Sequence, residues 1–190
     1  MWEYIELGLT HITDHPHYEV YDHILFIVAL VAGYSYQQWR PVIGMATMFT
    51  IGHSISLALA VSGIASPDSF WVEFGIQSSI IVTCLLNLFY PNHRQKYWPY
   101  LVAAAFGIIH GFGFAGYLSF MLSKGQSIAL PLLGFNIGIE IGQILILLVF
   151  FVLNGLYLRL GGNQRWWTIV ISIIAIVLAA FLLYGVVSSN

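Results

Sequence analysis

Residues 127–158, SIALPLLGFNIGIEIGQILILLVFFVLNGLYL, decide the fold class, because this long apolar run contains a single charged side chain, that of Glu140. An α-helix rises about 1.5 Å per residue, and about 20 apolar residues suffice to cross the hydrocarbon core of a bilayer. The run therefore predicts a transmembrane helix that is long enough to tilt or to extend beyond the bilayer.

Five further apolar segments accompany this run. The prediction is an all-α polytopic membrane protein with six transmembrane helices in one bundle, over approximately residues 22–38, 41–63, 68–90, 97–122, 127–158 and 166–187. Pro41, Pro67, Pro91 and Gly161 lie at joints between these segments, where helix breakers are expected. The predicted division is an external segment over residues 1–21 and a six-helix transmembrane domain over residues 22–190.

The composition agrees with a protein that lies in a lipid bilayer. Of the 190 residues, 59% are hydrophobic and only 7% are charged, whereas soluble domains carry about 25% charged residues. With a net charge of −2 and six basic residues, the chain has no basic surface for nucleic acid, so no nucleic-acid partner is expected. No positively charged stretch precedes the first apolar segment, so we expect no cleavable signal peptide.

The basic residues are distributed unequally between the two sides of the predicted bundle. All but one lie in the loops after the first, third and fifth predicted helices, at Arg40, Arg94, Lys96, Arg159 and Arg165. Only Lys124 lies on the other side. Since positive loops stay in the cytoplasm, this bias predicts a multi-pass protein of the bacterial inner (cytoplasmic) membrane with both termini external.

The amino-terminal stretch THITDHPHYEVYDHILF, residues 10–26, is rich in groups that bind metals. Imidazole and carboxylate together suit divalent transition metals such as nickel, cobalt, copper or zinc. A polar interfacial segment that leads into the first helix is the alternative interpretation. The candidate ligands are His11, Asp14, His15, His17, Asp22 and His23.

Two more histidines, His53 and His110, lie deep inside the second and fourth predicted helices. Ionisable groups at such depth are costly in lipid, so they normally face the bundle interior or a wet cavity. Thr50 and Ser54 share the helix face of His53, and Gly111 beside His110 permits close approach of a neighbouring backbone. We expect both histidines to contribute to a metal site; hydrogen bonding between helices is the alternative.

The fifth predicted helix has two distinct faces. Asn136, Glu140 and Gln143 form a polar stripe, which makes Glu140 a further candidate ligand and the two amides candidate pathway residues. Small residues that allow tight helix packing lie on the opposite face, at Gly134, Gly138 and Gly142. The neighbour on that face is either another helix of this chain or a second copy, in which case the protein is a homo-oligomer.

On the third predicted helix, Glu73 lies one turn outside Gln77. This pair indicates an access route from the external side toward the residues in the middle of the membrane. Polar contact between helices explains the pair equally well.

These constellations favour a metal permease over two alternatives. An intramembrane metallo-enzyme could use histidines and a carboxylate to hold zinc, but the chain contains neither H-E-x-x-H nor G-x-S-x-G. A b-type haem protein could use His53 and His110 as axial ligands, which leaves Glu140 and the amino-terminal histidines unexplained. Copper and zinc are alternative substrates, because imidazole ligands bind them as well.

Four ordered motifs are similar to those of the HupE/UreJ family of nickel permeases. They are Asp22-His23-Ile24-Leu25-Phe26, Phe49-Thr50-x-x-His53-Ser54-x-x-Leu57, Phe106-Gly107-x-x-His110-Gly111-x-Gly113-Phe114-Ala115 and Phe135-Asn136-x-Gly138-x-Glu140-x-Gly142-Gln143. The spacing His17-x4-Asp22-His23 also resembles a signature of nickel/cobalt transporters. The resemblance implies a permease, not an enzyme, that imports a divalent transition metal as its substrate, Ni²⁺ first, to supply hydrogenase or urease. Whether the amino-terminal and mid-membrane ligands form one site or two stays open in the sequence.

Overall fold

The computed structural model describes the chain apart from residues 14–18, 91–96, 122–126 and 189–190. Within the described residues it is all-helical, without strands, as the sequence predicts. The elements are α1 (Trp2–Thr13), α2 (Glu19–Val31), the short 3-10 helix η1 (Tyr36–Gln38), α3 (Trp39–Val61), α4 (Ser69–Phe89), α5 (Trp98–Met121), α6 (Ala129–Arg159) and α7 (Gln164–Ser188).

The helices α3 to α7 correspond to five of the six predicted spans, and each is long and apolar enough to cross a membrane. The prediction for the first span was too long, because α2 ends at Val31 instead of continuing to Gln38. Its 13 residues rise only about 20 Å, less than the roughly 30 Å of a hydrocarbon core. The helix ends here because side chains of α7 bind the next carbonyls: Thr168 and Gln164 donate to the carbonyl oxygen of Ala32 at 3.0 and 3.4 Å.

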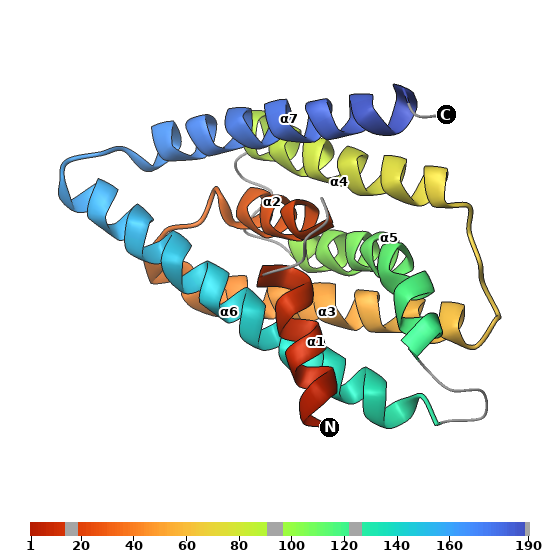
Figure 1. Cartoon of the computed structure of the whole chain (residues 1–190). Helices are drawn as coiled ribbons and strands as arrows, with labels where there is room; N and C mark the ends of the chain where they lie inside the picture. Colours follow the sequence, from red (N-terminus) through yellow and green to blue (C-terminus); the bar gives the residue numbers. More distant parts are fainter. Residues whose placement is uncertain (14–18, 91–96, 122–126, 189–190) are drawn as a thin grey trace.

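The helix α1 adds the length that α2 lacks. It runs beside the first half of α6 and in the same direction, since Tyr4 lies against Gly134 and Ile12 against Gly142 (Figure 1). The helix α2 continues toward the opposite end of the bundle, where Asn87 near the end of α4 donates to the carbonyl oxygen of Ala29 at 2.6 Å. Two half-helices in series thus cover the length of one transmembrane helix.

The external position predicted for residues 1–21 stays a prediction, and the structure shows where the helix in this segment packs. The described part, α1, packs on α6 through glycines on both helices. A Cβ added at Gly138 would overlap with the carbonyl oxygen of Ile5, and one at Gly8 with that of Phe135. The glycine stripe of α6 is thus covered by a helix of the same chain.

The helices α3 and α5 form the second closely packed parallel pair. A Cβ at Gly107 would overlap with the carbonyl oxygen of Phe49, and one at Gly111 with that of His53. Such backbone approach is what small residues permit between membrane helices. It fixes the depth of His53 on α3 relative to His110 on α5.

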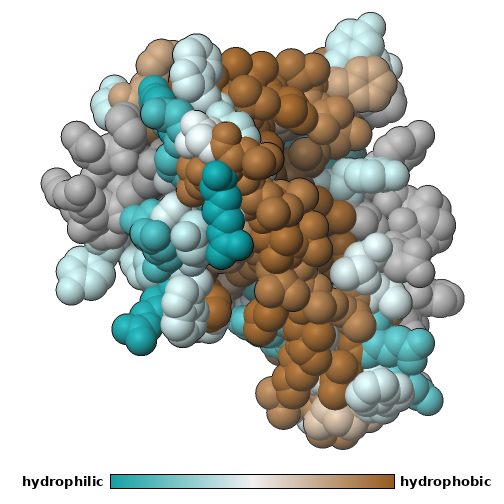
Figure 2. Space-filling model, turned by 90° about the vertical axis from the view of Figure 1, so that its left-hand side faces the viewer, coloured by the Kyte–Doolittle hydropathy of each residue, from teal (hydrophilic) through white to brown (hydrophobic). Residues whose placement is uncertain are grey.

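The outer surface of the bundle is apolar. Figure 2 shows a broad band of hydrophobic side chains on one face, with hydrophilic ones at its flanks. On α7, Val177 and Phe181 are 61% and 72% exposed. The tryptophans near the starts of α3, α4, α5 and α7 are exposed as well, as in an interfacial aromatic belt: Trp39, Trp71, Trp98 and Trp166. The chain is a multi-pass membrane protein.

Candidate metal centre

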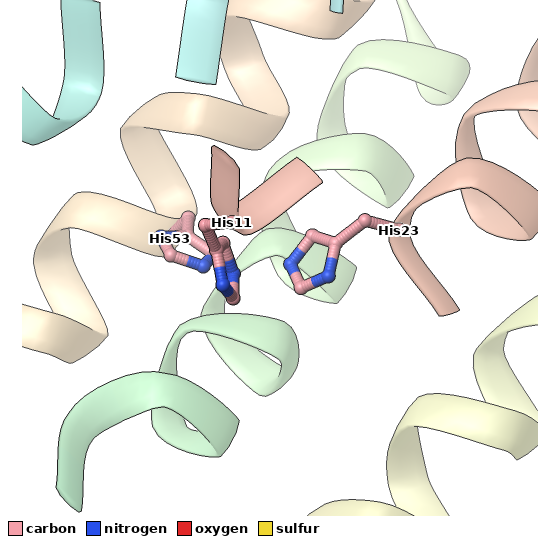
Figure 3. A group of neighbouring side chains, drawn as sticks. All are labelled: His11, His23 and His53. Atoms are coloured by element: carbon pink, nitrogen blue, oxygen red, sulfur yellow. The ribbon is translucent and has the colours of Figure 1, made fainter. Parts of the chain in front are cut away.

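Three buried histidines from three helices meet in the middle of the bundle. His11 lies in the last turn of α1, His23 near the start of α2 and His53 in the middle of α3. Figure 3 shows their rings turned toward one another, and one nitrogen from each ring lies within 4.8 Å of the others. They are 1%, 3% and 0% exposed, so all three side chains are buried.

The separation of these nitrogens is close to that of a loaded metal site. Transition metals bind imidazole nitrogen at about 2.0–2.1 Å, so two ligands of one ion lie at most about 4.2 Å apart. An inward shift of under about 1 Å per ring would therefore close the three histidines around a single ion. The described cluster contains no carboxylate, which makes it a neutral nitrogen site.

The histidine on α3, His53, is buried against aromatic rings that offer its nitrogens no hydrogen bond. Neither ring nitrogen of His53 has a hydrogen-bond partner among the described residues, although the side chain is fully buried. Burying an imidazole without partners costs roughly 1–3 kcal/mol by the scale of protein mutants. A bound cation would offset this cost, because it would occupy the lone pair that is now unsatisfied.

A fourth histidine, His110 on α5, stands beside this group. Its ring centroid lies 5.1 Å from that of His23, and its Nε2 lies 3.1 Å from the hydroxyl oxygen of Ser79. That hydroxyl donates its own proton to the carbonyl oxygen of Ile76 at 2.7 Å, so its oxygen accepts a hydrogen bond from Nε2–H of the imidazole. The lone pair then lies on Nδ1 of His110, which is buried and has no partner in the described chain.

Aromatic rings enclose the histidines. Phe114 lies 4.0 Å from the ring centroid of His11 and stacks on Phe135 at 4.9 Å. Phe49 contacts the rings of both His23 and His110, at 6.0 and 5.2 Å. An apolar shell of this kind excludes water and lowers the local dielectric, which strengthens binding of an ion to its ligands.

A small cavity of about 20 Å³ lies beside the cluster, lined by His11, Asp22, His23, Ile76, His110, Gly113 and Phe114. It has room for one water or ion, and it is far too small for a porphyrin.

A much larger cavity of about 1060 Å³, here called the vestibule, lies at the end of the bundle where α3 ends and α4 begins. Glu73 and Gln77 line it from α4, and the last turns of α7 form another wall. Asp22 lines the vestibule and the small cavity alike, as do Ile76 and Gly113. Asp22 therefore lies between the vestibule and the small cavity beside the histidines, and Gln77 donates to its carboxylate at 2.6 Å.

The predicted polar stripe of α6 lies elsewhere. Glu140 accepts a hydrogen bond of 3.5 Å from the hydroxyl of Thr47, and Gln143 accepts one of 3.3 Å from Thr50. Ser54 donates to the carbonyl oxygen of Thr50 on its own helix. The structure thus brings His11, His23, His53 and His110 together, and it does not bring Glu140 to the three-histidine cluster.

Other predicted residues are placed as follows. Asn136 is half-buried on α6, and Glu73 is exposed at the vestibule. The candidates Asp14, His15 and His17 lie outside the described residues.

Sequence reasoning missed two features of the centre. It did not predict that His11 is buried against other helices, although Gly8, one turn earlier, is a signal for close packing of that helix on a neighbour. It also missed Ser79, a hydroxyl residue inside an apolar run on the same helix as Gln77. Neither signal is strong without knowledge of the neighbouring helix.

The fold and the site together define the class of the protein. It is a polytopic helical membrane protein with a buried histidine cluster beside a cavity. Residues 1–188 match the HupE / UreJ protein family. The chain therefore belongs to the HupE/UreJ family, a family of nickel/cobalt transporters whose members are not enzymes. Neither a curated protein nor a solved structure matches the chain.

Proposed function

We propose that the chain is a permease that imports a divalent transition metal, with Ni²⁺ as the first candidate, through the centre built from His11, His23 and His53. The observation that carries this proposal is the meeting of three buried imidazoles from separate helices within 4.8 Å. Each imidazole can offer one nitrogen lone pair, and three such ligands suit a divalent ion of intermediate softness.

The vestibule is the proposed path to this centre. Its exposed carboxylate, Glu73, attracts cations, and Asp22 lies at the junction with the small cavity. A metal ion that replaces Gln77 as the partner of Asp22 then lies beside His23, because Asp22 and His23 are consecutive residues and both line the small cavity. Since carboxylates bind these divalent ions more weakly than imidazoles do, the ion moves inward to the histidines.

The opposite end of the bundle is closed by polar contacts. Arg165 at the start of α7 donates to the carbonyl oxygens of Asn87 and Leu88 at 3.0 and 2.6 Å, and Thr168 donates to that of Ala32. With the vestibule at the predicted external end, this arrangement corresponds to an outward-facing state. Release to the cytoplasm then requires α2 to part from α7, as alternating access demands.

The ligand set does not itself select one metal. Neutral imidazoles bind Cu²⁺, Ni²⁺, Co²⁺ and Zn²⁺, with copper the tightest in the Irving–Williams order. Nickel takes first place here because the family transports nickel or cobalt. His110, with its lone pair on Nδ1, is available as an additional ligand for a metal that prefers more than three.

We also propose the bacterial inner membrane as the location, with both termini external, since all described basic side chains lie at the end opposite the vestibule. They are Arg40, Arg159 and Arg165.

Binding of ⁶³Ni²⁺ to the purified protein tests the proposal. The wild type is expected to bind one ion per chain, and His53→Ala is expected to lose most of that affinity because it removes a ligand and leaves a void. Val61→Ala, on the same helix but away from the cluster, serves as the control. Equal binding by wild type and His53→Ala would contradict the proposed centre.

A further inference from the structure

Glu140 remains without a role once the metal is assigned to the histidines. It lies about 16 Å along α6 from Ala129, deep within an apolar helix. It lines neither the vestibule nor the small cavity. A cation that travels from the vestibule to the histidines therefore does not meet this carboxyl group.

No ion pair with Glu140 is present among the residues that the structure describes. The elements packed against α6 are α1, α2, α3 and η1, and single side-chain contacts add α5 and α7. Their charged and titratable groups with described side chains are Met1 (N-terminus), Glu3, Tyr4, Glu6, His11, Tyr21, Asp22, His23, Tyr36, Arg40, His53, Tyr100, His110, Arg165 and Tyr184. An unpaired carboxylate at this depth costs several kcal/mol, so the group needs a neutralising partner.

The surroundings of Glu140 suit a proton better than a metal ion. The hydroxyl of Thr47, its hydrogen-bond partner, can donate to a carboxylate and can accept from a carboxylic acid. One turn earlier on the same helix, the amide oxygen Oδ1 of Asn136 is buried and accepts no hydrogen bond within the described chain. A protonated Glu140 supplies the donor that this region lacks, whereas a divalent ion would need several more oxygen ligands.

We propose that Glu140 and Thr47 form a proton-binding site in the interface of α3 and α6, separate from the metal centre. Protonation adds one H⁺ to the carboxylate, and release returns it, so the site cycles between one negative charge and none. Thr47 and His53 lie on the same helix, which allows motion of α3 to link proton release to metal movement. This link rests on the proposed permease function, whereas the proton site itself does not.

Labelling by dicyclohexylcarbodiimide tests the site, because this apolar reagent modifies protonated carboxyl groups inside membranes. The full chain in lipid nanodiscs is treated across about pH 5 to 9, and the adduct on Glu140 is measured by mass spectrometry. We expect labelling to fall at least about tenfold across this range, as for a one-proton titration. Thr47→Val should move the pH of half-maximal labelling, and Glu6→Gln, which removes an exposed carboxylate of α1, should leave it unchanged.

Three results would overturn the proposal. Glu140 that is not labelled at any pH would show that it does not carry a proton. Labelling suppressed by Na⁺ and not by choline at the same pH would make it a sodium site. Loss of ⁶³Ni²⁺ binding in Glu140→Gln would make it a metal ligand. If instead the wild type binds no metal while pH-dependent labelling persists, the permease proposal fails and the proton site stands.

Transport in proteoliposomes tests the coupling separately. We expect an imposed pH gradient to change nickel uptake by the wild type, and Glu140→Gln to take up nickel at a rate that does not respond to the gradient. An equal response of both proteins would refute the coupling.

Discussion

Replacing Gly138 by alanine should disrupt the metal centre from a position that touches no ligand. The added Cβ would lie 2.7 Å from the backbone nitrogen of Leu9 and 2.9 Å from Cα of Gly8, and it would overlap with the carbonyl oxygen of Ile5. These obstacles are backbone atoms of α1, so no side-chain rotation relieves them. Normal contact distances require α1 to retreat by roughly 1 Å, and overpacking of this kind costs about 1–3 kcal/mol.

His11 moves with α1, so the retreat takes one of three nitrogens away from the ion. Displacing a supporting group of a metal site typically costs about 10–100-fold in affinity, and we expect Gly138→Ala to weaken Ni²⁺ binding by that amount. Gly142→Ala is the matched control on the same stripe, because its Cβ would meet Ile12 and Leu9 at ordinary distances of 3.4 and 3.5 Å.

Isothermal titration of Ni²⁺ into both purified variants measures this difference, with circular dichroism to confirm that each is folded. Nickel binding by Gly138→Ala within about twofold of the wild type, or an equal loss of affinity in both variants, would refute the link between α1 packing and the centre.

Three further predictions address the surroundings of the centre. If His110 is the additional ligand, Ser79→Ala should weaken nickel binding by about 10–100-fold, because His110 loses the partner that fixes its tautomer; unchanged binding would argue against His110 as a ligand held by this bond. Asp22→Asn should slow uptake more at low nickel than at high nickel, which initial rates of ⁶³Ni²⁺ accumulation would show, and equal slowing at all concentrations would argue against a role in capture. Arg165→Ala should make the native Cys84 thiol, which is buried, more reactive toward a maleimide, since the closed end loosens; unchanged reactivity would mean that Arg165 does not hold that end closed.

Hydropathy predicted the long helices well because their apolar length is a local property of the chain. The residues from 127 to 158 can only be a long membrane helix, and α6 covers most of that range. Hydropathy did not identify the shorter α1 as a helix of the bundle, since it has only 12 residues and carries Glu3 and Glu6. Its place in the bundle depends on the glycines of α6, which lie more than 100 positions further along the chain.

The site shows the same division between local and distant information. The depth of His53 and His110 in their helices is readable from the sequence, and it correctly predicted that both are interior residues. The rotation of α6 about its own axis decides whether Glu140 faces the histidines or Thr47. The spacing of polar residues along α6 does not show which helix lies against that face. The partners of His11 were hidden for the same reason, because burial of an amphipathic half-helix is set by packing and not by its own composition.

X-ray absorption spectroscopy of the nickel-loaded protein tests the central claim most directly. We predict a first shell with at least three imidazole nitrogens at about 2.0–2.1 Å, and one imidazole fewer in each of His11→Ala, His23→Ala and His53→Ala. A shell of oxygen ligands alone, or a shell that none of the three substitutions changes, would contradict a metal centre at the meeting point of α1, α2 and α3.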